Sequence, residues 1–406
     1  MKQRLFGWLT FLLLSLTATA QQPSIYDLQK PFGFCTRSSR TADSAFVVIG
    51  GGCYAYPVQG VSSSDVITLT STGSDMKAEI ARAVNDYRVI VFDGSKGDFI
   101  VSGTIIINAV SNKTLLGING ARLCTKWFAT QEIISALNEA GVPSMSTSGG
   151  TGGILSNGAR VGEQAEFNTR QIIINMTGDQ NEVYRKSGIF FFRHCQNLIL
   201  RNLRFVGPGS IDVGGDDLLT FNGTKNSWVD HCDFTDGMDG NFDITQRSDF
   251  NTVSWCTFSY TERSYMHQNT NLIGSSDREA TGFLNTTYAF NHWGDRCQAR
   301  MPMARVGKVH MLNNYYTSAG CQVCINPRKN SEFLIEGNYF DKGIMRCFGQ
   351  TDATAVTWAD NNYITEPMKH QPSSSGPVVT VPYPYTVADP AIVPTEVVTH
   401  AGATLK

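Results

Sequence analysis

Charge is scarce in this chain. Charged side chains make up only 17% of the 406 residues, and 33 basic residues against 35 acidic ones leave a net charge of −2. Proteins that hold nucleic acid or anionic lipid through charge carry a clear basic excess. The composition therefore excludes a general affinity for either partner, and we expect a monomer that binds neither nucleic acid nor membrane.

Long hydrophobic runs are absent after the N-terminus, where no stretch reaches the roughly 18 apolar residues of a membrane-spanning helix. The N-terminus itself has a basic start at Lys2 and Arg4, an apolar run over Leu5–Leu16, and the small-residue pattern Ala18-Thr19-Ala20. These three parts predict a signal peptide over residues 1–20, with a buried N-terminal helix as the alternative.

Removal of that segment would send a single domain, residues 21–406, to the periplasm or the medium. The ten cysteines in it are too sparse for a disulfide scaffold, although an exported chain can form disulfides and the sequence leaves their pairing open. Cys321-x-x-Cys324 is the only close pair, and without a second pair or nearby histidines it does not indicate zinc.

Glycine is abundant, with 38 residues, and a repeat appears in the C-terminal half. Short strand-like segments contain an aromatic residue at Phe234, Phe258, Trp293, Tyr315 and Tyr339, in steps of 24, 35, 22 and 24 residues. Periods of this size, with one short strand per unit, predict a solenoid.

The residues that recur favour a parallel β-helix. Leucines at regular spacing are missing, whereas Val/Ile strands carry Asn, Cys or an aromatic residue at matched positions. We expect Asn291 and Asn313 to align in one ladder and Cys232 and Cys256 in another stretch of it, where stacked polar groups satisfy each other. An antiparallel sandwich is the alternative fold.

The N-terminal half fits the same plan. A helix over Met76–Tyr87, capped by Ser74 or Asp75, would shield the first coil from edge pairing. Strands are expected over Arg88–Phe92, Thr104–Asn108 and Lys113–Leu116, and a second helix over Thr130–Ala140. A Gly/Ser-rich surface loop is expected at Ser146–Gly153, and residues 364–406 should pack along the outside of the solenoid.

Carboxylates gather at one level of the repeat. Asp239 and Asp243 are four residues apart, while Asp216 and Asp217 come about one repeat earlier. Because stacked coils lie about 4.8 Å apart, Asp217 would join the other two. Three such carboxylates repel one another unless a hard cation such as Ca²⁺ joins them. Solvated turn aspartates are the alternative.

Arginines follow the acids. Arg300 and Arg305 bracket Pro302, and Arg328 comes about one coil later. Guanidinium groups bind carboxylates in a bidentate manner, so these arginines would suit an acidic polymer. Ion pairs with the three aspartates are the alternative.

The ordered motifs resemble those of the pectate lyases of polysaccharide lyase family 1. Two of them carry most of the resemblance, Trp228-Val229-Asp230-His231 and the arginine segment from Arg300 to Arg305. Ser111-Asn112-Lys113-Thr114 before Leu116-Gly117, and Asn313-Asn314-Tyr315-Tyr316, also look like family segments. The resemblance extends over nearly the whole mature chain.

This resemblance implies a right-handed parallel β-helix that cleaves α-1,4-linked polygalacturonate by Ca²⁺-assisted β-elimination. The calcium ligands of the family match Asp217, Asp239 and Asp243. A fourth acidic position of the family is Gly215 here, with Asp216 as a neighbouring substitute.

The resemblance also assigns the basic residues. It makes Arg300 the base, has Arg305 and Arg328 bind substrate carboxylates, and puts Arg263 where the family has a lysine. Because a guanidinium stays protonated at ordinary pH, such a base predicts an alkaline optimum. We expect Asp230 and His231 to lie inside the coil as structural hydrogen-bonding residues.

Three other functions fit parts of the sequence. A metal-independent pectin lyase would act on methyl-esterified pectin and resist chelators. A non-catalytic β-helix would bind acidic glycans without needing Arg300. A glycoside hydrolase would need two carboxylates in acid and base or nucleophile roles, and it would leave the arginines unexplained.

Overall fold

The computed structural model describes residues 30–142, 161–211, 214–349, 352–368 and 371–406. The predicted signal peptide over residues 1–20 and the excursion Ser146–Gly153 lie outside these ranges. None of the described helices is both long enough and apolar enough to cross a membrane.

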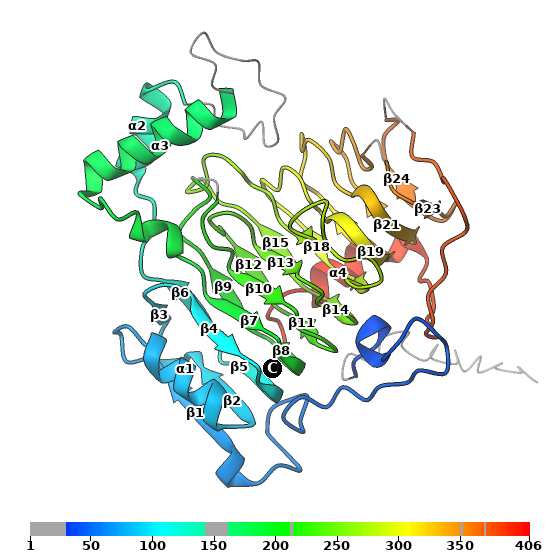
Figure 1. Cartoon of the computed structure of the whole chain (residues 1–406), viewed down its shortest axis with the longest axis horizontal. Coiled ribbons are helices and arrows are strands. Elements are labelled where there is room, and N and C mark those ends of the chain that lie inside the picture. Colours follow the sequence, from blue (N-terminus) through cyan, green and yellow to red (C-terminus); the bar gives the residue numbers. More distant parts are fainter. Residues whose placement is uncertain (1–29, 143–160, 212–213, 350–351, 369–370) are drawn as a thin grey trace, which may run out of the picture.

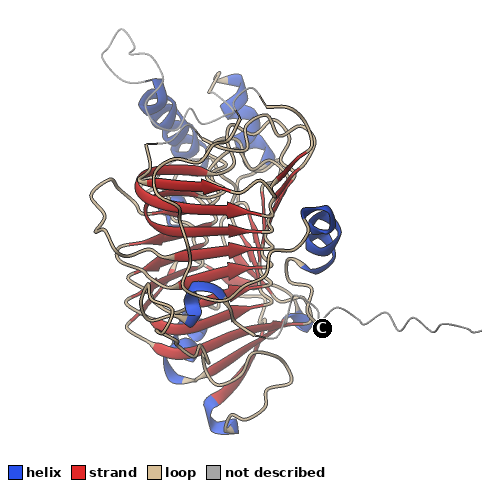
Figure 2. Ribbon diagram, turned by 90° about the vertical axis from the view of Figure 1, so that its right-hand side faces the viewer, coloured by secondary structure: helices blue, strands red, loops and turns tan. Residues whose placement is uncertain are grey.

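The chain winds into a parallel β-helix, in which most coils contribute one strand to each of three columns (Figures 1 and 2). Every pairing between the named strands is parallel, which confirms the predicted solenoid and excludes the antiparallel sandwich. A typical coil passes from column B through column A to column C and then returns to column B.

The columns run as follows. Column A contains β1 (Val66–Thr70), β2 (Val89–Asp93), β5 (Ser111–Ile118), β8 (Gln196–Arg201), β11 (Trp228–Asp230), β14 (Asn251–Ser254), β17 (Thr286–Ala289) and β23 (Ala355–Trp358). Column B contains β4 (Ile105–Asn108), β7 (Phe190–Arg193), β10 (Leu219–Asn222), β13 (Phe242–Thr245) and β16 (Leu272–Ile273). The long strands β19 (Met303–Leu312) and β21 (Asn326–Glu336) join columns A and B into one sheet.

Column C forms the second sheet. It contains β3 (Phe99–Val101), β6 (Arg122–Thr125), β9 (Arg204–Val206), β12 (Asp233–Thr235), β15 (Thr257–Ser259), β18 (His292–Trp293), β20 (Tyr315–Tyr316), β22 (Tyr339–Phe340) and β24 (Tyr363–Ile364).

An aromatic stack fills the interior beneath column C. Rings on successive coils lie 4.5–5.4 Å apart between centroids, in the order Phe205, Phe234, Phe258, Trp293, Tyr316 and Phe340. The aromatic residues that mark the repeat in the sequence include Phe234, Phe258 and Trp293 of this stack, whereas Tyr315 and Tyr339 each precede the stacked ring of their coil by one residue. Tyr315 pairs with His292, and Tyr339 pairs with Tyr315, on the other face of the sheet, because side chains alternate along a strand.

An asparagine ladder runs beside this stack. Asn291 donates from Nδ2 to Oδ1 of Asn314 at 3.1 Å, and Asn314 donates in turn to Asn338 at 2.9 Å. Cys256 continues the row, since its backbone N–H donates to Asn291 Oδ1. The predicted ladder therefore exists with its cysteine stretch, but the choice of Asn313 was wrong by one residue, because that residue adopts a positive φ of 51° and turns toward the C-terminal segment.

Helices cover parts of the β-helix. α1 (Lys77–Asp86) begins beside Asp75, as predicted, and buries Ile80 and Val84 against the first coils. α2 (Gln131–Glu139) matches the second predicted helix. Two helices were not predicted: α3 (Val161–Thr177), which lies against α2, and α4 (Val393–His400), which carries the tail over Trp255 and Phe290 (Figure 1).

Asp230 and His231 are buried structural hydrogen-bonding residues, as predicted, but Asp230 lies on the outer face of the coil and not inside it. Only Val229 points into the core, and alternation turns Trp228 and Asp230 to the outer face. There Asp230 is fully buried and binds Arg201 and His231 at 2.7 and 2.6 Å. Segments from both ends of the chain cover this face, so burial here reflects tertiary packing.

Replacement of Asn314 tests the ladder. Asn314→Ala removes two donated hydrogen bonds and leaves groups on the coils on either side unsatisfied, at about 1–3 kcal/mol for each buried group. We expect urea denaturation to show a clear loss in the free energy of unfolding. Asn362→Ala, at the half-exposed end of the ladder, should lose much less, and equal losses would contradict the ladder's role.

Candidate active site

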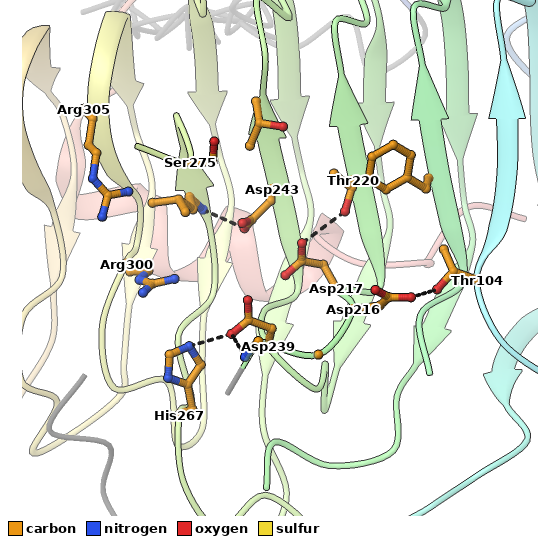
Figure 3. Close-up of a pocket in the computed structure, with 15 residues that line it drawn as sticks. Thr104, Asp216, Asp217, Thr220, Asp239, Asp243, His267, Ser275, Arg300 and Arg305 are labelled. Carbon is orange, nitrogen blue, oxygen red and sulfur yellow. Dashed lines mark hydrogen bonds and ion pairs between the residues drawn. The ribbon is translucent and has the colours of Figure 1, made fainter. Parts of the chain in front are cut away.

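A cavity of about 450 Å³ opens over the outer face of column B (Figure 3). The loops that enter this column from column C supply most of its polar lining, because each of them ends at the same edge of the stacked strands. The lining includes Asp216, Asp217, Asp239, Asp243, His267, Arg300 and Arg305. Residues spread over 90 positions of the sequence thus share one site.

The fold brings Asp217 and Asp243 close to Gly240. A Cβ atom added at Gly240 would lie 2.8 Å from Asp217 Oδ1 and 3.4 Å from Asp243 Oδ1. Asp217 Oδ2 accepts a hydrogen bond from Thr220, and Asp243 Oδ1 accepts one from the backbone of Leu272. Asp217 Oδ1, in contrast, is buried and has no hydrogen-bond partner among the residues that the structure describes. The absence of a side chain at Gly240 therefore preserves a small space beside an unsatisfied carboxylate oxygen.

The three carboxylates differ in their protonation behaviour. Burial, followed by the charges of Asp243 and Asp239, raises the pKa of Asp217 well above its usual value. Burial also raises the pKa of Asp243 to about 7, against the opposing effect of Arg300. For Asp239 burial has the same tendency, but the hydrogen bond and charge of His267 together with Arg300 outweigh it and lower the pKa. A buried carboxylate held at unfavourable energy gains from a bound cation.

Carboxylate oxygens are hard donors that suit Ca²⁺. The Asp217 oxygen that lacks a hydrogen-bond partner would be stabilised by such an ion. In the part of the chain that the structure describes, however, no three His, Cys, Asp or Glu side chains converge as a ready-made metal site. Asp239 Oδ1 accepts from His267 and from the backbone of Gly214. Asp217 and Asp243 could hold a cation between them, and Asp239 lines the same cavity.

The position of the missing fourth acid is closed. A Cβ at Gly215 would lie 2.4 Å from Met238 Cγ, so the methionine fills the space that a longer side chain would need. Asp216 lines the cavity but turns to Thr104, whose Oγ1 donates to it at 2.5 Å (Figure 3).

Arg300 and Arg305 face the carboxylates. Arg300 lies in the left-handed region at φ 58°, and its carbonyl accepts from the backbone of Asn271 on the coil before. No hydrogen bond or ion pair joins its guanidinium to another residue drawn in Figure 3. Arg305 donates to the Gly274 carbonyl and pairs with Asp277 at 3.3 Å, and burial followed by the charge of Arg300 lowers its pKa.

The other two predicted arginines lie outside the cavity lining. Arg328 is one coil beyond Arg305, since Ala304 pairs with Pro327, and its exposed side chain binds Asp352 at 3.1 Å. Arg263 turns away toward α2, with its guanidinium 4.7 Å from the centroid of the Phe128 ring and 3.7 Å from Asp236. The structure thus brings Asp217, Asp239, Asp243, Arg300 and Arg305 together, and places Arg263 elsewhere.

Comparison with known proteins gives a consistent result. A family model described as pectate lyase matches residues 130–405. Pectate lyase A of Aspergillus niger is 32% identical over 237 residues, which cover 56% of this chain and 68% of that protein. The chain belongs to the pectate lyase family. It is therefore a polysaccharide lyase.

Solved pectate lyase structures share the fold at low sequence identity. Pectate lyase C from Erwinia chrysanthemi, at pH 9.5 with 30 mM Ca²⁺, has a TM-score of 0.52 at 19% identity, with 88% of this chain and 94% of that chain covered. A pectate lyase variant from Xanthomonas campestris has a TM-score of 0.51 at 18% identity, covering 92% and 98%. These likenesses establish the parallel β-helix for this member of the family.

His267 is the site residue that the sequence did not reveal. Its side chain is 2% exposed, and its Nε2 lies 2.9 Å from Asp239 Oδ1 (Figure 3). It follows Asp239 by 28 residues, about one coil, compared with the 22 residues that separate Asp217 from Asp239. A spacing of about one coil could have indicated that His267 lies near Asp239. Because the loops vary in length, the spacing alone does not identify which residue of the next coil meets Asp239.

Gly240→Ala tests the space between the carboxylates. The added methyl group would meet Asp217 Oδ1 at 2.8 Å, so we expect calcium affinity, measured by isothermal titration calorimetry, to fall at least about tenfold, the lower end of what disturbing the surroundings of a metal ligand costs. Gly294→Ala is the matched control, because its Cβ would meet nothing closer than 3.4 Å. Unchanged affinity in Gly240→Ala would show that no ion uses this space.

Proposed function

We propose that this chain cleaves α-1,4-linked polygalacturonate by Ca²⁺-assisted β-elimination, after export through the predicted signal peptide, as a monomer. One observation carries the proposal: the same cavity holds buried carboxylates, with an unsatisfied oxygen on Asp217, and the arginines of the Arg300–Arg305 segment. Family membership supports it, as does the solved structure of the Erwinia pectate lyase C with Ca²⁺.

The residues divide the work by charge. Asp217 and Asp243, with Asp239 beside them, would hold Ca²⁺, which when bound neutralises the uronate carboxylate and stabilises the charge that develops next to C5. Arg305 is placed at the cavity wall to bind a substrate carboxylate, and Arg328 extends this basic row by one coil. Substrate would displace Asp277 and Asp352 from these arginines, and such exposed ion pairs contribute little to stability.

Arg300 would remove the C5 proton. It lies within the electrostatic influence of Asp239 and Asp243, and its backbone conformation is fixed by the preceding coil. The O4 glycosidic oxygen then leaves as the C4–C5 double bond forms. Arg263 has no place in this scheme, because its guanidinium contacts Phe128 outside the cavity.

A metal-independent pectin lyase acting on methyl-esterified pectin is the second candidate. The occlusion of Gly215 by Met238 and the absence of a ready-made three-ligand group in the described residues favour it. Retention of three acids argues against it, because neutral esters offer no carboxylate for a bridging cation. Ultraviolet absorbance of the unsaturated product, on pectate and on esterified pectin with and without EDTA, separates the two. No unsaturated product under any condition would contradict both.

Arg300→Lys tests the base. Loss of a positioned general base lowers kcat by about 10²–10⁴-fold, and lysine cannot reproduce the guanidinium geometry. Arg122→Lys, at an exposed ion pair in β6, is the matched control and should keep wild-type kcat. An Arg300→Lys variant with full activity would assign the base elsewhere.

The pH profile gives an independent check. Because a guanidinium accepts a proton only after losing its own, the active fraction grows as the pH rises. We expect kcat at saturating calcium to increase from mildly acidic to alkaline pH. A flat profile over that range is incompatible with an arginine base.

A further inference from the structure

The loop between β15 and β16 places a buried histidine against one of the site acids. His267 Nε2 lies 2.9 Å from Asp239 Oδ1, and the same oxygen accepts the backbone N–H of Gly214 at 3.2 Å. Asp239 is thus held through one carboxylate oxygen by groups from two different loops. The imidazole lies on the side of Asp239 away from Asp217 and Asp243 (Figure 3).

The backbone of His267 is fixed independently of Asp239, and Asn269 Nδ2 lies 3.2 Å from Nε2 of the imidazole. His267 adopts the left-handed conformation at φ 58°, and its carbonyl accepts from Ser210 Oγ and from the backbone N–H of Asn269, both at 2.7 Å. Ser210 belongs to an earlier coil, and its one hydroxyl proton is shared between this carbonyl and that of Met238, next to Asp239, at 3.0 Å. The backbone at His267 and the backbone next to Asp239 therefore contact the same serine.

The contact between His267 and Asp239 matters more because few other acidic side chains are available at this site. Gly215 is closed by Met238, and Asp216 binds Thr104, so neither supplies another ligand as the loops stand. A site with only three acids depends on how well each is oriented. Groups that hydrogen-bond to a ligating carboxylate set its direction, and their loss commonly lowers metal affinity by about 10–100-fold.

We propose that His267 is a positioning residue that holds Asp239 in the orientation needed to complete a calcium site with Asp217 and Asp243. The inference rests on the proposed function, since it requires that calcium binds here. It goes beyond that function because it assigns to a histidine, His267, the task of orienting the third carboxylate, Asp239. An imidazole that merely fills a buried space would not affect calcium affinity separately from stability.

Two substitutions separate these roles. His267→Gln keeps an N–H at about the place of Nε2, whereas His267→Asn tolerates the positive φ but is too short to reach Asp239. Calcium is titrated into each substrate-free full-length protein by isothermal titration calorimetry, and Tm is measured without calcium. We expect His267→Asn to raise the Kd about tenfold or more, and His267→Gln to retain most of the wild-type affinity.

A kinetic measurement adds a second readout. The calcium concentration for half-maximal activity should rise in His267→Asn, while kcat at saturating calcium recovers. Wild-type affinity in His267→Asn, or equal weakening in both variants with equal loss of Tm, would overturn the positioning role. Absence of calcium binding in the wild-type protein would instead overturn the proposed calcium function, and this inference with it.

Discussion

Parallel stacking of one coil on the next, in a fixed register, is the constraint on which this structure depends. Backbone hydrogen bonds between coils hold equivalent residues about 4.8 Å apart, so whatever one coil places at a position meets its counterpart on the next. The aromatic stack from Phe205 to Phe340 and the ladder from Asn291 to Asn362 both follow from that repetition. A change of one residue in register would turn either set to the opposite face.

The same repetition builds the site. The loops that enter column B vary in length, but each must return to the next strand at the same edge, and so their polar residues accumulate over one face. Like charges meet there as readily as complementary groups. Burial, and after it the charge of neighbouring aspartates, raises the pKa of Asp217 and Asp243. Burial of carboxylates lowers the stability of the folded protein, and binding of a cation or a substrate would offset that loss.

Variation within the family pattern has a structural explanation here. Met238 occupies the space beside Gly215, Thr104 binds Asp216, and His267 binds Asp239. Each of the three contacts joins residues from different coils, and together they decide how many oxygen atoms are available to a cation.

The sequence by itself determined the solenoid, the level of the three acids and the arginine pair, because coil-to-coil stacking converts spacing of about 22–24 residues into proximity. It chose Asn313 for the ladder in place of Asn314, since a period of irregular steps does not fix which face a side chain takes. Only the tertiary structure decided that Arg263 turns to Phe128, that Asp230 is buried beneath distant segments, and that His267 meets Asp239. Those contacts depend on the conformations of the loops and on how the terminal segments pack against the β-helix, which no local sequence pattern encodes.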